Sequence, residues 1–224
     1  MDIVDTIALT MGVAWASGIN LYAALFMLGY MGVTGNIELP PDLLVLQNPL
    51  VMAAAGFMYC VEFFADKIPG VDSTWDTMHT FIRIPAGAML AGAAVGDVNQ
   101  GVEFAALILG GTLSAGTHFT KAGSRLLINT SPEPVTNWTA SITEDLAVIG
   151  GLWAALNHPV LFLIALALFI ALVIWLLPKL WRGIKRVGRA IGRLFGRGQD
   201  ETITTTITPP DTAGINLENK SDSS

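Results

Sequence analysis

The chain has 224 residues, of which 52% are hydrophobic and 13% are charged, and its mean hydropathy is +0.57. Soluble globular domains carry about 25% charged residues, so this composition excludes an ordinary soluble domain and predicts a membrane protein. The single Cys60 excludes an intrachain disulfide, three separated histidines exclude a paired-ligand metal site, and we expect no cofactor.

The first apolar run extends from Ile7 to Val33, longer than the roughly 20 residues that cross a bilayer. Near its middle lie Gly18 and Asn20, which weaken a helix. Two interpretations stay open here: a small-residue packing notch with one hydrogen-bonded Asn, or a broken helix whose backbone groups meet a solute. The residues before the run lack the positive charge of a secretory signal, so we expect no cleaved peptide.

A polar loop over residues 34–47 precedes the second run, Leu50 to Ala65, and the proline at position 49 suits a helix start. Glu62 and Asp66 lie four residues apart on one face of this helix. They repel each other unless a cation or a shared proton lies between them.

Ile68-Pro69-Gly70 predicts a turn, after which Asp72 or Ser73 caps a short helix from Thr74 to Ile82. Three ionisable residues follow one stripe of this helix: Asp76, His79 and Arg83. The stripe is either the polar face of an interfacial turn or part of a site that faces a cavity.

The third run begins at Pro85 and the fourth at Gly101, with a tight turn between them. Both carry small residues at four-residue spacing, which allows helices to approach closely in lipid. We therefore predict an antiparallel helical hairpin. The fourth helix continues past its apolar part into His118, Lys121 and Arg125.

The fifth run begins at a capping box, Ser141 to Glu144, and extends to Leu156. Glu144 and Asp145 lie at its start. The sixth run extends from Val160 to Leu177, and Pro178 closes it.

These segments predict an all-α polytopic membrane bundle of about six hydrophobic segments over residues 1–178. If all six cross, every Lys and Arg lies on one side, together with both termini and the loops at 66–83 and 119–140. Positive residues mark the cytoplasm, so we predict an inner-membrane protein with cytoplasmic termini. The second, third and fifth runs are short, so some segments are candidates for broken or re-entrant helices.

Residues 179–197 predict a basic amphipathic helix in the membrane interface, because apolar and cationic side chains separate onto two faces. The predicted lipid contacts, to anionic phospholipid at the cytoplasmic face, are Lys179, Arg182, Lys185, Arg186, Arg189, Arg193 and Arg197. The aligned apolar face argues against nucleic-acid binding. Residues 198–224 are polar and predict a disordered cytoplasmic tail.

Four stretches resemble a bacterial membrane family called domain of unknown function 4126 over about residues 7–177. They are SGINLY (17–22), ADKIPGVDSTWDTMHTFIRIPAGA (65–88), SAGTHFTKAGSRLLINTSPEPVTN (114–137) and ASITEDL (140–146). The resemblance implies a multi-pass inner-membrane protein and supplies no activity.

The leading hypothesis for function is a transporter or channel for a small solute or ion. Its candidate site comprises Asn20, Glu62, Asp66, Asp76, His79, Arg83, Lys121, Arg125, Glu144 and Asp145. In that role Glu62 or Asp66 is the proton- or cation-linked carboxylate. The alternative is a non-catalytic membrane organiser that binds lipid or a partner through the basic helix, and homo-oligomerisation is left open. An intramembrane enzyme ranks third and we expect no catalytic residues, because motifs for a nucleophile, a metal or a phosphate are absent.

Overall fold

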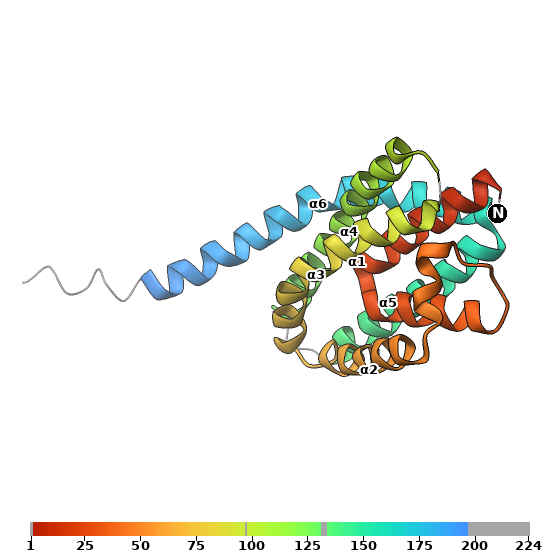
Figure 1. Cartoon of the computed structure of the whole chain (residues 1–224). Coiled ribbons are helices and arrows are strands. Elements are labelled where there is room, and N and C mark those ends of the chain that lie inside the picture. Colours follow the sequence, from red (N-terminus) through yellow and green to blue (C-terminus); the bar gives the residue numbers. More distant parts are fainter. Residues whose placement is uncertain (1, 97, 131–133, 197–224) are drawn as a thin grey trace, which may run out of the picture. The chain divides into compact units, whose positions relative to one another are not determined.

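The computed structural model describes residues 2–96, 98–130 and 134–196, and the regular structure in these ranges is helical throughout (Figure 1). The elements in chain order are α1 (Ile3–Val33), η1 (Pro41–Gln47), α2 (Pro49–Ala65), α3 (Val71–Val95), α4 (Gln100–Ile128), α5 (Pro134–Asn157) and α6 (Pro159–Gly196). Residues 1–187 form one compact unit, and the described residues after 187 belong to a second unit. The predicted disordered tail and Arg197 lie outside the described residues, as does the side chain of Arg193.

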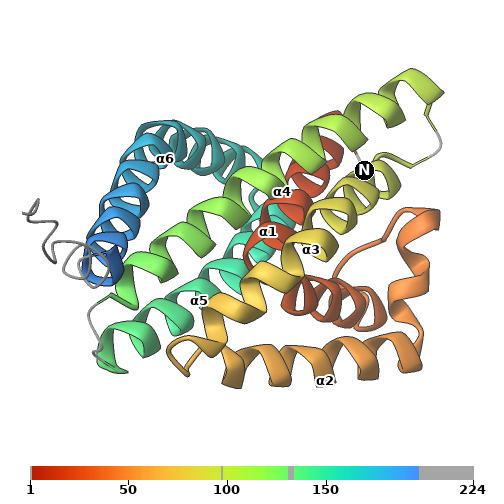
Figure 2. The same cartoon turned by 90° about the vertical axis from the view of Figure 1, so that its left-hand side faces the viewer.

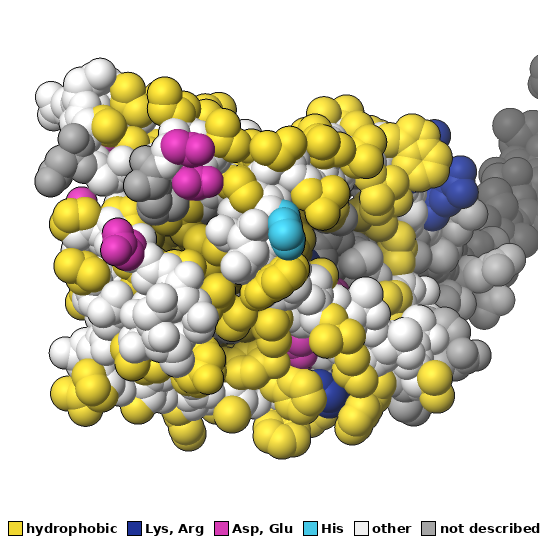
Figure 3. Space-filling view, turned by 90° about the vertical axis from the view of Figure 1, so that its right-hand side faces the viewer, with side chains coloured by type: hydrophobic (Ala, Val, Ile, Leu, Met, Phe, Trp, Pro, Cys, Tyr) yellow, Lys and Arg dark blue, Asp and Glu magenta, His cyan; other side chains and the backbone are white. Residues whose placement is uncertain are grey.

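Among the described residues, three helices are long and apolar enough to cross a membrane: α1, α3 and the part of α6 from Pro159 to Arg186. A fourth candidate is the pair formed by η1 and α2, which are bent by 70° relative to each other. Hydrophobic side chains cover most of the described face in Figure 3, and charged side chains on it are few. The protein is therefore an all-helical, multi-pass membrane protein.

Helix α1 is broken at Asn20, whose backbone angles are φ −146° and ψ 96°. Figure 1 shows the chain doubling back after this point. Asp5 and Glu38 line one cavity of about 170 Å³, although a straight helix of 31 residues would be about 45 Å long. The two halves of α1, residues 3–19 and 21–33, therefore enter and leave at the same end of the unit.

That end is opposite the turn between α2 and α3. Asp2 and Ile3 line a cavity of about 770 Å³ with Val95 and Val98, at the far end of α3. Helix α3 has 25 residues and is about 37 Å long, which separates Asp2 from Val71. The prediction that the start of the chain shares a side with the loops at 66–83 and 119–140 is wrong, because the break at Asn20 reverses the chain.

The predicted antiparallel hairpin of α3 and α4 is confirmed, and small residues set its spacing. A Cβ on Gly110 would clash with the Cβ of Ala91, and a Cβ on Gly92 would lie 2.9 Å from the side chain of Leu107. Helix α4 is also close to α1, because a Cβ on Gly18 would collide with Thr117. Figure 2 shows α4 running alongside α3 with α1 behind them.

Several helix boundaries differ from the prediction. Helix α3 begins at Val71, after Gly70 with φ +86°, and continues through Pro85, so the separate short helix and its cap are wrong. Helix α5 begins at Pro134, so the capping box at Ser141 is wrong. Helix α6 likewise continues through Pro178. A proline removes one backbone hydrogen bond, whereas ending a helix in lipid would expose several polar groups, so continuity is favoured.

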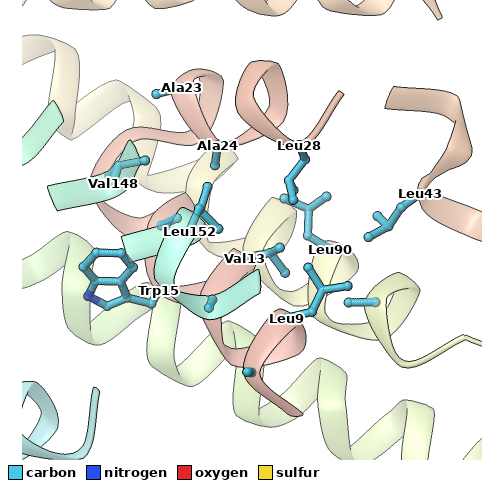
Figure 4. Close-up of a cluster of buried hydrophobic side chains, with 14 of the residues drawn as sticks. Leu9, Val13, Trp15, Ala23, Ala24, Leu28, Leu43, Leu90, Val148 and Leu152 are labelled. Carbon is cyan, nitrogen blue, oxygen red and sulfur yellow. The ribbon is translucent and has the colours of Figure 1, made fainter. Parts of the chain in front are cut away.

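Helix α1 is the central element, since it contacts α2, α3, α4, α5 and η1. Both of its halves contribute to one apolar core, as Figure 4 shows for Val13 and Leu28. The same core includes Leu43 of η1, Leu90 of α3, Leu152 of α5 and Phe162 of α6. An element buried in this way meets protein on most sides, which permits an irregular backbone at membrane depth.

Candidate functional site

Charged side chains from four helix ends meet beside the break in α1. We name the following nine residues the charged cluster: Glu62, Asp66, Lys67, Asp76, Arg83, Lys121, Arg125, Glu144 and Asp145. They come from the end of α2, the first half of α3, the end of α4 and the first half of α5. All are buried except Glu144, whose side chain is 19% exposed. Glu144 is therefore the member nearest to solvent.

Acids and bases alternate through this cluster. Arg83 donates to Asp76 Oδ1 at 2.9 Å and to Glu62 Oε1. Lys121 Nζ donates to Asp66 Oδ2 at 2.8 Å and lies 3.5 Å from Glu62 Oε1. Lys121 is thus the cation that separates the two acids of α2, as the four-residue spacing required.

Arg125 connects the ends of α2, α4 and α5. Its Nη2 donates to Glu144 Oε2 at 2.7 Å, and its Nη1 donates to Asn137 Oδ1 at 2.6 Å. The backbone carbonyl of Asp66 also accepts from Nη1 at 3.2 Å. A fully buried guanidinium with these partners locks three helix ends together.

The cluster includes the backbone that the break in α1 releases. Lys121 Nζ donates to the carbonyl of Ile19 at 3.1 Å. Asn20 Oδ1 accepts from the Ala23 amide at 3.0 Å, and Asn20 Nδ2 donates to Asp145 Oδ1 at 3.0 Å. The broken-helix interpretation is therefore confirmed for the backbone, and the Gly18 contact shows that the packing notch is present as well.

Two histidines, His79 and His118, lie beside the cluster. Thr80 donates its hydroxyl proton to the Asp76 carbonyl, so it accepts from His118 Nε2 at 2.7 Å. His118 Nδ1 then accepts from Arg83 at 3.5 Å. His79 donates from Nδ1 to its own helix and contacts Tyr22, so it packs beside the cluster without an ion pair among the described residues.

Lys67 closes the cluster at the turn between α2 and α3. Its Nζ donates to Ser141 Oγ at 3.3 Å and lies 2.9 Å from the ring centroid of Phe63. Burial lowers the pKa of Lys67 below its usual range. Contact with an aromatic ring partly replaces the lost hydration of the ammonium group.

The cluster carries one net negative charge when all members are ionised, since it has five acids and four bases. Several buried oxygens have no hydrogen-bond partner within the described chain: Glu62 Oε2, Asp66 Oδ1, Asp76 Oδ2 and Asp145 Oδ2. Across the described ranges, no three His, Cys, Asp or Glu side chains are grouped as metal ligands are. The arrangement can therefore exchange a proton or hold a small ligand, and it lacks the geometry of a metal centre.

Sequence reasoning identified most of this site and missed four contributors. The structure brings together all ten predicted residues, with His79 at the edge. The missed residues are Lys67, His118, Asn137 and Ser141. A four-residue repeat through Asn137, Ser141 and Asp145 was the available signal, because it follows one face of a helix.

The basic segment has a mixed environment. Lys179, Arg182 and Arg186 are exposed, whereas Leu180 and Ile184 contact Gly123 of α4. Part of its apolar face is thus covered by protein.

Buried ion pairs around a broken central helix define a multi-pass membrane protein with a polar site inside its helical bundle. The chain matches the model of a family described as a domain of unknown function, DUF4126, over residues 7–179. It belongs to the DUF4126 family. No curated protein and no solved structure matches it.

Proposed function

We propose that the protein transports a small solute or ion, and that the charged cluster forms its site. The observation that carries this proposal is the break in α1 inside the cluster, where Lys121 binds the released carbonyl of Ile19. Discontinuous helices whose backbone groups meet charged side chains at membrane depth are typical of transporters.

The free-energy cost of burying the charged cluster supports a functional role for it. Burying charges is expensive even when they are paired, and apolar side chains of similar size often stabilise a fold as well or better. Nine buried or nearly buried charged residues in one bundle are therefore difficult to explain by stability alone. Intramembrane charges usually belong to ion or proton pathways.

The charge distribution favours one orientation. The four cations of the bundle lie at the cluster end, and the end with the start of α1 carries Asp2, Asp5 and Glu38. Positive residues mark the cytoplasm, so the cluster end is cytoplasmic in an inner membrane. Helix α1 is then re-entrant from the outside. The start of the chain is therefore external.

Flux into proteoliposomes tests the transport proposal. Reconstituted full-length protein is exposed to gradients of potassium chloride, potassium acetate and glycerol, with light scattering and a pH-sensitive dye as readouts. We expect flux above that of protein-free vesicles for at least one probe. Asn20→Leu lowers it at least tenfold, whereas Asn157→Leu, at an exposed helix end, leaves it unchanged.

The same assay separates the carboxylates. Glu62→Gln and Asp66→Asn each disturb the pairing of Lys121 and should reduce flux. Unchanged flux in both variants removes these acids from the mechanism, and no flux with any probe contradicts the proposal.

A second candidate is a membrane organiser that binds anionic lipid through the basic segment. It is supported by the exposed Lys179, Arg182 and Arg186 together with Trp181, which is 60% exposed. Deletion of residues 179–224, which removes all four of these side chains, should then abolish binding of the protein's detergent micelles to phosphatidylglycerol vesicles and leave helix content unchanged apart from the deleted segment. Undiminished binding after the deletion would remove this candidate.

A further inference from the structure

We infer that Asp145 is the proton-binding carboxyl of the charged cluster, and that Asn20 couples its protonation to the break in α1. The inference rests on the proposed function, because it names the coupled ion of that site. The sequence alone favours Glu62 or Asp66 for this role, so Asp145 replaces that prediction.

Ion pairing distinguishes the five acids. Four of them lie within 4.0 Å of a Lys or Arg nitrogen: Glu62, Asp66, Asp76 and Glu144. Each of these four has two such cations. Asp145 has no ion pair within that distance in the described part of the chain.

Hydrogen bonding also distinguishes Asp145, because its donor among the described residues is a neutral amide, whereas Glu62, Asp66 and Asp76 each accept from a Lys or Arg. Asp145 is 6% exposed; its Oδ1 accepts one hydrogen bond from Asn20, and its Oδ2 has no partner among the described residues. The fully buried Asp72 provides the contrast, because both of its oxygens accept hydrogen bonds from Asn129 or backbone amides. An unpaired buried carboxylate is costly, and protonation removes its charge.

The electrostatic surroundings of Asp145 come from several elements. Asp66 and Tyr59 face it from α2, Lys67 from the following turn, and Lys121 from α4. The two lysines bind other groups: Lys67 donates a hydrogen bond to Ser141, and Lys121 forms ion pairs with four other carboxylates. One bound proton neutralises the cluster, and Asp145 is the acid that loses least by taking it.

Asn20 gives protonation a structural consequence. It donates to Asp145 while its own oxygen caps the second half of α1 through the Ala23 amide. A proton taken from water at the rim beside Glu144 binds Asp145 Oδ2. The protonated Oδ2 is then a hydrogen-bond donor, and the neutral carboxyl group attracts the side-chain amide of Asn20 less strongly than the carboxylate does. The start of the second half of α1 therefore responds to one protonation event.

Infrared difference spectroscopy of the full-length protein in nanodiscs tests this assignment directly. A step from alkaline to acidic pH should produce the carbonyl stretch of one protonated buried carboxyl. We expect Asp145→Asn to remove this band and Asp145→Glu to shift it. Glu103→Gln, at an exposed acid outside the charged cluster, should retain it. The protection factor for amide hydrogen exchange in a peptide over residues 19–25, which removes the intrinsic effect of pH, should change with pH in the wild type and not in Asp145→Asn.

Each other outcome overturns the inference. A band that persists in Asp145→Asn, or that disappears in Glu62→Gln or Asp66→Asn instead, assigns the proton to another residue. A band in the wild type that sodium or potassium chloride removes at constant pH shows an alkali-cation site. If Asp145→Asn does not fold, an unshifted band in Asp145→Glu contradicts the assignment. These readouts need no solute flux, so loss of the transport proposal leaves a measured proton site intact, and the reverse also holds.

Discussion

Single charged residues of the cluster are tied to several partners, so replacing one leaves the others unpaired. Arg83 is the clearest case, because its guanidinium is fully buried and bonds to both Glu62 and Asp76. Its backbone carbonyl also accepts from the hydroxyls of Ser17 and Ser114. The residue therefore joins α1, α2, α3 and α4 at one point.

We predict that Arg83→Met lowers the free energy of unfolding by about 3–5 kcal/mol, because two buried carboxylates lose their main cation. Arg182→Met is the matched control; Arg182 is exposed, and its substitution should change stability by less than about 0.5 kcal/mol. Unfolding in mixed micelles with increasing dodecyl sulfate measures both values. Equal stability of the two variants would show that Arg83 is not needed to balance the acids.

At the scale of elements, small residues decide how closely α1, α3 and α4 approach. Gly18 faces the backbone carbonyl of Ser114, and Gly87 faces the side chain of the same residue. These contacts hold the break of α1 against α4, which brings Ile19 within reach of Lys121. The geometry of the polar site therefore depends on the close packing at these glycines.

A methyl group at position 18 should disrupt this arrangement. We predict that Gly18→Ala lowers stability by about 1–3 kcal/mol through overpacking, and that it also reduces flux, because α1 must move away from Lys121. Gly116→Ala provides the control, since nothing lies within 4 Å of a Cβ there. Its effect should stay within about 1 kcal/mol and can be stabilising. Thermal unfolding in detergent compares the pair, and similar melting temperatures would contradict the packing argument.

At the scale of the whole molecule, the fold-back of α1 sets the number of crossings. We predict that Asp2→Cys and Glu38→Cys, each in a Cys60→Ser background, react with a membrane-impermeant maleimide added to intact spheroplasts. Arg182→Cys should react only after lysis. Protection of position 2 together with labelling of position 38 would instead show that α1 crosses the membrane once.

Composition, charge and residue spacing predicted the class of protein, the α3–α4 hairpin and the residues that meet in the cluster, whereas the family followed from the resemblance of four sequence stretches. Those properties depend on local patterns, such as apolar runs, four-residue spacing and small-residue ridges. The direction of α1 could not be predicted in this way, because an apolar run records length and not orientation. Asn20 allowed the hypothesis of a broken helix, but it did not indicate that the chain reverses its direction there.

The sequence also did not predict which charged side chains of the site form ion pairs with each other. Glu62 and Asp66 are two acids on one helix face and attract attention, yet their cations come from Arg83, Lys121 and Arg125. Asp145 is unremarkable in sequence beside Glu144. Its isolation from cations depends on contacts between helices far apart in the chain, which no local pattern records.

The central position of α1 has a consequence for how the protein is made. Asn20 leaves the ribosome 125 residues before its partner Asp145. Until α5 has been synthesised, the nascent α1 lacks much of the protein that encloses it, and its polar break is open to water or to an insertion factor. Ribosome-stalled chains that end before α5 should thus be cleaved by protease near residue 20, and chains that extend through α5 should resist.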